Sequence, residues 1–280
     1  MKIKYLGTAA AEGVPAIFCN CDVCTKSRER GGKNIRTRSQ AIIDDKLLID
    51  FPADTYTHCL NNGINLTKVE HCLITHTHSD HLYPDDLIMR FPGFSDMGKG
   101  KPFNLYGLSG AMLNVNAYIN KHTFDSKDII ETNVLELYKP IKIDEYTVTA
   151  LEAIHDVHSY PAIYLITNHE NKTILYAHDT NYLCEDVWNY IGDNGIKLDF
   201  VSLDCTDGDI ETRTYIGHMN LKDNIKVMNR LKEMGAAGEN TIFCSNHFSH
   251  NGKDVLYDDF SVIAEKSGIL TSYDGMEITF

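Results

Sequence analysis

Four side chains of metal-binding types lie within the six residues from 76 to 81. They are His76, His78, Asp80 and His81, and they follow directly on a short apolar segment, residues 71–75, that has the character of a buried strand. A polar loop with incidental histidines is the alternative interpretation, but this density of ligands after a strand favours a metal site. The fold must therefore bring this loop to a place where further ligands can join it.

The spacing within this segment indicates two ions rather than one. In an extended loop alternate residues face the same side, so His76 and His78 can bind one ion together. Asp80 and His81 follow a tighter turn and can bind a second ion. Imidazole nitrogens suit zinc, manganese, iron or nickel, and the carboxylate adds negative charge that stabilises a dication.

A second group of metal-binding side chains lies near the N-terminus. Three of the eight cysteines, Cys19, Cys21 and Cys24, fall within six residues. Disulfides are improbable in a long chain of cytosolic character, so this crowding indicates metal binding, with three reduced cysteines in a loop as the alternative. A structural zinc ion takes four ligands, so a fourth must come from elsewhere in the chain. We expect the remaining cysteines in the core.

The chain as a whole suits one domain covering residues 1–280. Its formal net charge of −13 weighs against a large nucleic-acid substrate, because proteins that bind phosphate backbones usually present a basic face. The sequence has no long apolar segment at its start and no stretch that approaches the ~20 apolar residues of a membrane helix. We therefore expect a soluble cytoplasmic protein with no membrane partner, and we leave a homodimer open.

Hydrophobic patterns predict many strands, with helices concentrated later in the chain. Strands are predicted at residues 2–6, 71–75, 104–107, 134–137, 146–154, 199–203, 241–244 and 276–280, and hairpins at 41–50 and 162–177. Helices are predicted at residues 52–61, 84–90, 183–191 and 221–234. This order fits layered sheets with helices outside.

The segment from residue 76 to 81 resembles the signature of the metallo-β-lactamase superfamily. The resemblance implies an α/β fold, the αββα sandwich, with a two-metal site at one edge of the sheets. It also implies three later ligands that each follow a strand. His155, Asp179 and His247 stand at such positions.

By this resemblance, His76, His78 and His155 would bind one ion, Asp80, His81 and His247 the other, and Asp179 would bridge both. His158 is an alternative to His155, although the phase of residues 148–151 favours His155. His178 stands before Asp179, where the family usually has a small residue; it could support the site or simply be packed.

The loop of residues 7–15 and the cysteines after it resemble the PhnP-like phosphodiesterase subgroup of this superfamily, and PqqB-like proteins share the feature. The resemblance covers nearly the whole chain. It implies that His250, three residues after His247, is the fourth ligand of a structural zinc ion with Cys19, Cys21 and Cys24.

The resemblance also implies a hydrolase with two catalytic divalent ions, zinc or manganese. Two such ions lower the pKa of a shared water, so that a metal-bridging hydroxide can attack at neutral pH. We expect a phosphodiesterase for a small cyclic phosphate ester, with 5-phosphoribosyl 1,2-cyclic phosphate as the best single candidate.

Asp80 and His218 are the residues expected to take a direct part in catalysis. By resemblance His218 lies near the scissile phosphate, where it would protonate the leaving alkoxide or donate to a phosphoryl oxygen. The alternative is a histidine at a helix start that faces solvent. Arg36 and Arg38 could reach a substrate phosphate or be ordinary surface or core-flanking residues.

Two other functions stay open. A tRNase Z-like RNA endonuclease is disfavoured by the acidic net charge and by the lack of an evident basic arm. A PqqB-like accessory metal-binding protein is the non-catalytic alternative, and the complete set of seven ligands weighs against it. β-Lactam hydrolysis is disfavoured because no periplasmic signal is evident.

Overall fold

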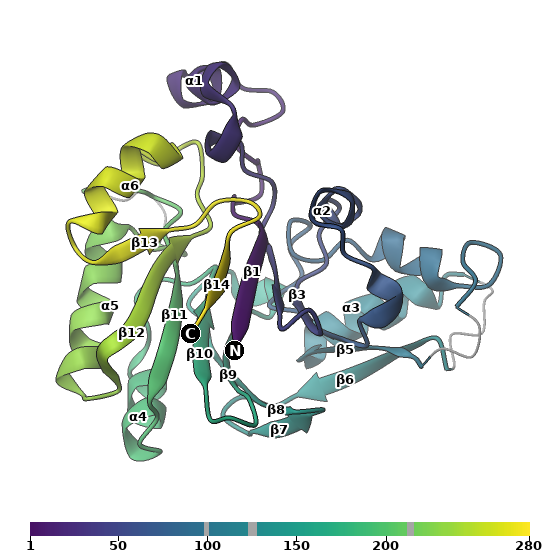
Figure 1. Cartoon of the computed structure of the whole chain (residues 1–280). Helices are drawn as coiled ribbons and strands as arrows, with labels where there is room; N and C mark the ends of the chain where they lie inside the picture. The colour runs from purple at the N-terminus through teal and green to yellow at the C-terminus, as the bar shows by residue number, and fades with distance from the viewer. Residues whose placement is uncertain (98–100, 123–127, 212–215) are drawn as a thin grey trace.

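The computed structural model describes residues 1–97, 101–122, 128–211 and 216–280. Within these residues the strands form two seven-stranded sheets that pack face to face, and helices cover the outer faces (Figure 1). This is the αββα arrangement expected from the sequence. Both termini lie at one end of the central strands (Figure 1), where the Met1 carbonyl oxygen accepts a hydrogen bond from the Phe280 N–H.

The first sheet combines an antiparallel part with a parallel part. The antiparallel part joins the two ends of the chain, because β1 pairs with both β2 and β14. From β3 to β6 neighbouring strands are parallel. The order across the sheet is β14 (Glu277–Thr279), β1 (Lys2–Gly7), β2 (Gln40–Ile43), β3 (Leu47–Ile49), β4 (His71–Leu73), β5 (Phe103–Leu108) and β6 (Ile130–Leu135).

The second sheet is built in a similar way. An antiparallel meander of β7, β8, β9 and β10 leads into the parallel strands β10 to β13. The order across the sheet is β13 (Ile269–Thr271), β12 (Ala237–Asn246), β11 (Leu198–Asp204), β10 (Thr173–Ala177), β9 (Ala162–Thr167), β8 (Tyr146–Glu152) and β7 (Ile141–Ile143).

The helices are partly those that the patterns predict. Both hairpins and the helices predicted at 52–61, 183–191 and 221–234 are confirmed with shifted ends, and residues 84–90 form a 3-10 helix. The patterns missed α1, α3 and α6. The α-helices are α1 (Asp22–Arg30), α2 (Thr55–Asn62), α3 (Ser109–Ile119), α4 (Glu185–Asp193), α5 (Leu221–Glu233) and α6 (Tyr257–Glu265); the 3-10 helices are η1 (Gly32–Asn34), η2 (Leu66–Lys68), η3 (Pro84–Arg90) and η4 (Val157–Ser159). No helix among the described residues is long and apolar enough to cross a membrane.

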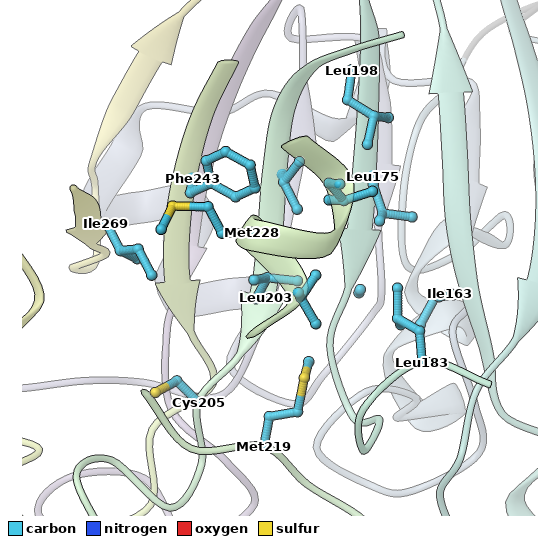
Figure 2. Close-up of a cluster of buried hydrophobic side chains, with 14 of the residues drawn as sticks. Ile163, Leu175, Leu183, Leu198, Leu203, Cys205, Met219, Met228, Phe243 and Ile269 are labelled. Carbon is cyan, nitrogen blue, oxygen red and sulfur yellow. The ribbon is translucent and has the colours of Figure 1, made fainter. Parts of the chain in front are cut away.

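Apolar side chains fill the space between the sheets and the space under each helical layer. Figure 2 shows the outer core of the second sheet, where Met228 of α5 packs among Leu203, Phe243 and Ile269. Strand β10, nearly all of β11 and residues 243–246 of β12 are buried, because side chains cover both faces of the sheet there.

The cysteines outside the N-terminal group follow the prediction in part. Cys72, Cys205 and Cys244 are buried, whereas Cys59 and Cys184 are only partly buried. All eight cysteines are free thiols.

Candidate functional site

The ends of six strands deliver one cluster of polar side chains. Each of these strands ends within a few residues of a histidine or an aspartate, and seven of these side chains are buried. Loops at strand ends are the usual place for functional groups in such folds, because rigid strands hold them. The residues are Asp50 after β3, the segment 76–81 after β4, His155 after β8, Asp179 after β10, Asp204 at the end of β11 and His247 after β12.

His76, His78 and His155 form the first half of the cluster. His155 Nε2 lies 3.2 Å from His78 Nδ1, and the His76 ring centroid lies 4.6 Å from that of His78 and 5.1 Å from that of His155. The Nε2 atom of His76 is buried without a hydrogen-bond partner. One nitrogen from each ring lies within 4.8 Å of the others, so together they can bind one ion.

Hydrogen bonds on the opposite ring nitrogens orient these three histidines. His78 Nε2 lies 3.4 Å from Asp156 Oδ2, and His155 Nδ1 lies 3.2 Å from the Gly217 carbonyl oxygen. His76 Nδ1 lies 3.1 Å from Thr75 Oγ1. A donor bond at one nitrogen makes the other an acceptor, so His78 offers Nδ1 while His76 and His155 offer Nε2 to an ion.

The structure also separates His155 from its alternative. His158 lies on η4 with an exposed side chain, whereas the His155 side chain is only 3% exposed and faces the cluster. The structure therefore places His155, and not His158, beside His76 and His78.

Asp80, His81, Asp179 and His247 form the second half. Asp179 Oδ2 lies 2.6 Å from His81 Nε2 and 2.8 Å from His247 Nε2, and the two imidazole nitrogens are 3.2 Å apart. Asp80 Oδ2 lies 3.3 Å from His81 Nε2. One ligand atom from each of the four residues lies within 4.8 Å of the others, so this half can bind a second ion.

Asp179 connects the two halves. Its Oδ2 faces His81 and His247, and its Oδ1 lies 3.6 Å from His155 Nε2 in the first half. Both Asp179 and His247 have a positive φ, at 48° and 64°. A left-handed backbone is uncommon outside glycine and concentrates at functional positions. Asp179 therefore lies between the two groups of histidines.

The electrostatics of the second half favour positive charge. Burial opposes ionisation of Asp179, yet His247 and His81 hold the pKa of its carboxyl well below the ordinary range. Burial likewise opposes charge on His81, but Asp179, Asp80 and Asp50 hold its pKa well above the ordinary value. Buried carboxylates are costly without a cation beside them. The donor set and the unpartnered His76 nitrogen both fit divalent ions at this point.

Two buried aspartates that the sequence analysis did not single out support the ligands. Asp50 accepts from His81 Nδ1 at 2.7 Å and from the Thr75 N–H at 2.7 Å. Asp204 accepts from the backbone N–H groups of Asp179, at 3.0 Å, and Met219, at 2.9 Å. Both are fully buried at strand ends. Carboxylates that orient metal-binding histidines are a recurring feature of such sites, and an aspartate closing a buried strand is the signal that could have identified them.

His218 lies beside the cluster and is held by Asp204. Its Nδ1 lies 3.0 Å from Asp204 Oδ2, 3.1 Å from Thr206 Oγ1 and 3.6 Å from Asp179 Oδ1. Burial opposes protonation, but Asp204 raises the pKa of His218 above its ordinary value. The side chain is 14% exposed, so His218 does not simply face solvent.

An open pocket of about 230 Å³ gives access to the cluster. Ligands of both halves, His218 and a short loop after β1 line it. The lining residues are Ala10, Ala11, Glu12, His78, Asp80, His155, Asp179, Thr206, His218, His247 and Ser249. A larger apolar groove of about 580 Å³ lies between α2 and η3 and contains none of these residues.

Cys19, Cys21, Cys24 and His250 form a separate cluster in which all four ligand atoms lie within 4.8 Å of one another. His250 Nδ1 is 3.5 Å from the sulfurs of both Cys19 and Cys21. Burial opposes ionisation, but the Cys24 N–H and His250 lower the pKa of Cys21 to about 6. Three thiols and an imidazole at these distances suit a structural zinc ion.

Three further residues have packing roles. Arg36 is buried, donates to Thr8 Oγ1 and the Ser272 carbonyl oxygen, and stacks over Phe248 at 4.1 Å. Arg38 pairs with Asp54 at 3.2 Å and donates to the Ala11 carbonyl oxygen. His178 is buried and lies 2.7 Å from Ser202 Oγ.

Comparison with known families places this geometry in context. Residues 48–238, more than half of the chain, match the model of the β-lactamase superfamily domain. The coenzyme PQQ synthesis protein B of Methylobacterium radiotolerans is 28% identical over 130 residues, 42% of this chain and 40% of that protein. Ribonuclease Z of Staphylococcus saprophyticus is 30% identical over 119 residues, 42% of this chain and 33% of that enzyme. The alignments thus span less than half of these relatives.

Solved structures share the fold over the whole chain. A diphosphatase of the PhnP family has a TM-score of 0.73 at 21% identity, covering 100% of this chain and 97% of that one. Zinc-bound PqqB from Methylobacterium extorquens has a TM-score of 0.72 at 18% identity, with 100% of both chains covered. The short form of human tRNase Z has a TM-score of 0.66 at 15% identity, covering 100% of this chain and 99% of that one.

Proposed function

The chain belongs to the metallo-β-lactamase superfamily, and from that premise we propose that it is a metal-dependent hydrolase of small phosphodiesters. The main support for the proposal is that Asp179 lies against both groups of histidines. A single carboxylate whose two oxygens face two sets of ligands suits a pair of neighbouring ions. Such a pair suits a phosphodiester, whose oxygens it can bind on both sides of the phosphorus.

We assign the ligands as two groups with one shared residue. His76, His78 and His155 would hold one ion, Asp80, His81 and His247 the other, and Asp179 would contact both. When bound, the two ions supply an activated water and neutralise negative charge on the phosphate oxygens. Zinc and manganese both suit this mixture of imidazole and carboxylate ligands.

The other residues of the site would position groups and move a proton. Asp50 and Asp204 hold His81 and His218 in fixed orientations. Because Nδ1 of His218 is directed to Asp204, Nε2 is the nitrogen that can carry a proton to the leaving oxygen. Thr206 Oγ1 lies 2.8 Å from His247 Nδ1, which directs His247 Nε2 toward Asp80 and Asp179.

A chromogenic diester tests the proposal. Protein loaded with zinc or manganese should hydrolyse bis(p-nitrophenyl) phosphate and lose that activity on chelation, with recovery when the ion is restored. Metal analysis should give up to two exchangeable ions besides one tightly held zinc ion. Failure of every divalent ion to support turnover of any phosphodiester would contradict the proposal.

The natural diester has two specific candidates. The resemblance in sequence suggests 5-phosphoribosyl 1,2-cyclic phosphate, and the neighbouring diphosphatase of the PhnP family is consistent with a small phosphate ester. A cyclic phosphate without a second phosphate group is the other candidate. Rates on both, measured with the same metal-loaded preparation, would separate them.

The similarity to ribonuclease Z supports a second candidate, the cleavage of transfer-RNA precursors. The net charge of −13 weighs against it, because RNA binding depends on contacts to phosphates. A precursor RNA belongs in the substrate panel, and salt-sensitive cleavage of it would favour this candidate. Tight zinc binding with no turnover of any ester would favour the PqqB-like accessory role.

A further inference from the structure

The loop after β1 forms a wall of the pocket and is joined to the loop after β12. The Ala10 N–H donates to the Phe248 carbonyl oxygen at 3.0 Å, and the Phe248 N–H donates to the Thr8 carbonyl oxygen at 3.0 Å. Gly7 permits the start of this loop to pass close to the backbone of Arg38, since a Cβ there would lie 1.9 Å from the Arg38 carbonyl oxygen. The two joined loops bring Ala10, Ala11 and Glu12 next to His247 and Ser249 at the pocket.

Glu12 is the acidic residue in this wall that we do not assign as a metal ligand. Its Oε1 accepts from Asn251 Nδ2 at 3.2 Å, and its Oε2 lies 3.4 Å from Ser249 Oγ. Both donors come from the loop that carries His247 and His250. The carboxylate is therefore held at the pocket rather than swinging in solvent.

The described lining of this pocket contains no lysine or arginine. The two arginines that the sequence offered for phosphate binding do not line it, because Arg36 is buried under the first loop and Arg38 is paired with Asp54. Bound ions would balance a single phosphodiester, but a second phosphate beside this wall would meet Glu12 and no lysine or arginine among the described lining residues. Groups of like charge brought together in a binding site weaken binding.

We propose that Glu12 determines substrate specificity by charge. Its carboxylate accepts hydrogen bonds from neutral hydroxyl groups of the ester and repels a second phosphate. The inference rests on the proposed function and narrows it to diesters with one phosphate group. It thereby favours a simple cyclic phosphate over 5-phosphoribosyl 1,2-cyclic phosphate. A site that combines an attractive contact with a repulsive one discriminates more strongly than either alone.

A matched pair of substrates tests this inference. Cytidine 2′,3′-cyclic phosphate and its 5′-phosphorylated form differ only in the second phosphate. The metal-loaded wild-type protein should prefer the first in kcat/KM by about tenfold or more. Glu12→Gln removes the charge and retains an acceptor oxygen, so it should reduce that preference about tenfold.

Binding provides a readout that does not depend on turnover. Calorimetry of the metal-loaded protein with cytidine 3′-monophosphate and cytidine 3′,5′-bisphosphate should show the same preference and the same change in Glu12→Gln. Glu12→Ala should also weaken the binding of cytidine 3′-monophosphate about tenfold, because this change removes the oxygen that accepts a hydrogen bond from the ligand.

Two variants serve as controls. Asn251→Ala removes the hydrogen bond that holds Glu12 while leaving its charge in place, so the preference should be retained. Glu233→Gln makes the same chemical change at an exposed residue of α5, and this variant should show the same substrate preference as wild type.

Any one of three results would overturn the inference. The preference could be unchanged in Glu12→Gln, the wild-type protein could prefer the bisphosphate, or neither nucleotide could bind. Binding that depends on Glu12 without turnover of any diester would instead contradict the proposed function alone.

Discussion

The two metal-binding clusters of this protein are built in opposite ways. The central cluster collects ligands from the ends of strands in both sheets, and Asp80, His81, Asp179 and His247 are all buried. The N-terminal cluster draws on two loops and the first turn of α1, and Cys21 is exposed. The ends of strands hold the central side chains, whereas the side chains of the cysteine cluster lie mostly on loops. We therefore expect ion removal to affect catalysis at the first and local folding at the second.

The chemistry of the ligands follows the same division. Imidazole and carboxylate in the central cluster suit exchangeable ions that can also bind substrate, and the cluster opens to a pocket. Thiolates suit a tightly held zinc ion with a closed coordination shell. His250 lies only three residues after His247, so a zinc ion bound at the cysteine cluster would hold the loop that carries His247.

The largest effect is expected at the central cluster. Asp80→Ala and His81→Ala should each lower diesterase turnover by at least ~10²-fold, because one ion and its share of charge stabilisation are lost. Circular dichroism and the melting temperature should change little, since the sheets hold this region. Turnover within a factor of a few of wild type in both variants would remove the two-ion mechanism.

His218→Ala should have an effect that depends on the leaving group. General acid catalysis is typically worth ~10²–10⁴-fold, but p-nitrophenolate leaves without a proton and a ribose alkoxide does not. The loss should therefore be small on bis(p-nitrophenyl) phosphate and large on a 2′,3′-cyclic nucleotide, with both ions retained. Equal losses on the two substrates would point to stabilisation of phosphoryl oxygens instead.

Changes in the cysteine cluster should act through structure. Cys21→Ser should remove the tightly bound zinc ion, lower the melting temperature, and reduce turnover about 10–100-fold through displacement of the His247 loop. Metal analysis before and after dialysis against a weak chelator would measure the loss. Cys72→Ser, in the buried core, is the control that should keep the zinc ion. Full zinc content in Cys21→Ser would exclude the proposed ligand set.

A buried histidine outside both clusters provides a reference without a metal ion. His58 lies against Gln40 and Thr37, and burial lowers its pKa to about 4. The unfolded chain binds this proton near pH 6.5, so the contribution of His58 to stability is complete above that pH and is lost as pH falls toward 4. The shift corresponds to about 3 kcal/mol.

Urea unfolding at pH 7 and at pH 4.5 measures this effect. When the pH is lowered from 7 to 4.5, the free energy of unfolding should decrease more for wild type than for His58→Gln. Only the wild-type chain can gain a proton at this position when it unfolds. Parallel pH dependence in the two proteins would contradict the assigned cause.

Much of the candidate site could be predicted from side chains that lie close together in the sequence. The ligands at 76–81 and the three cysteines are close in sequence, and a strand followed by a loop was enough to group them. His155, Asp179, His247 and His250 came from the family resemblance, and the structure brings each to its expected neighbours. Asp50 and Asp204 were missed because each is a single aspartate at the end of a strand, a weaker signal than several ligands close together in one loop.

The sequence by itself determined which functional groups are available. They are imidazoles and carboxylates after buried strands and thiols in a short loop, in a chain with an acidic net charge. Only the tertiary structure decided which of these groups meet. It placed His155 rather than His158 beside the other histidines, buried Arg36 away from the pocket and placed Glu12 in the pocket lining. The physical reason is that the spacing of side chains within one loop depends only on the local sequence. Whether side chains from different loops meet depends on how the two sheets pack and where their parallel strands end.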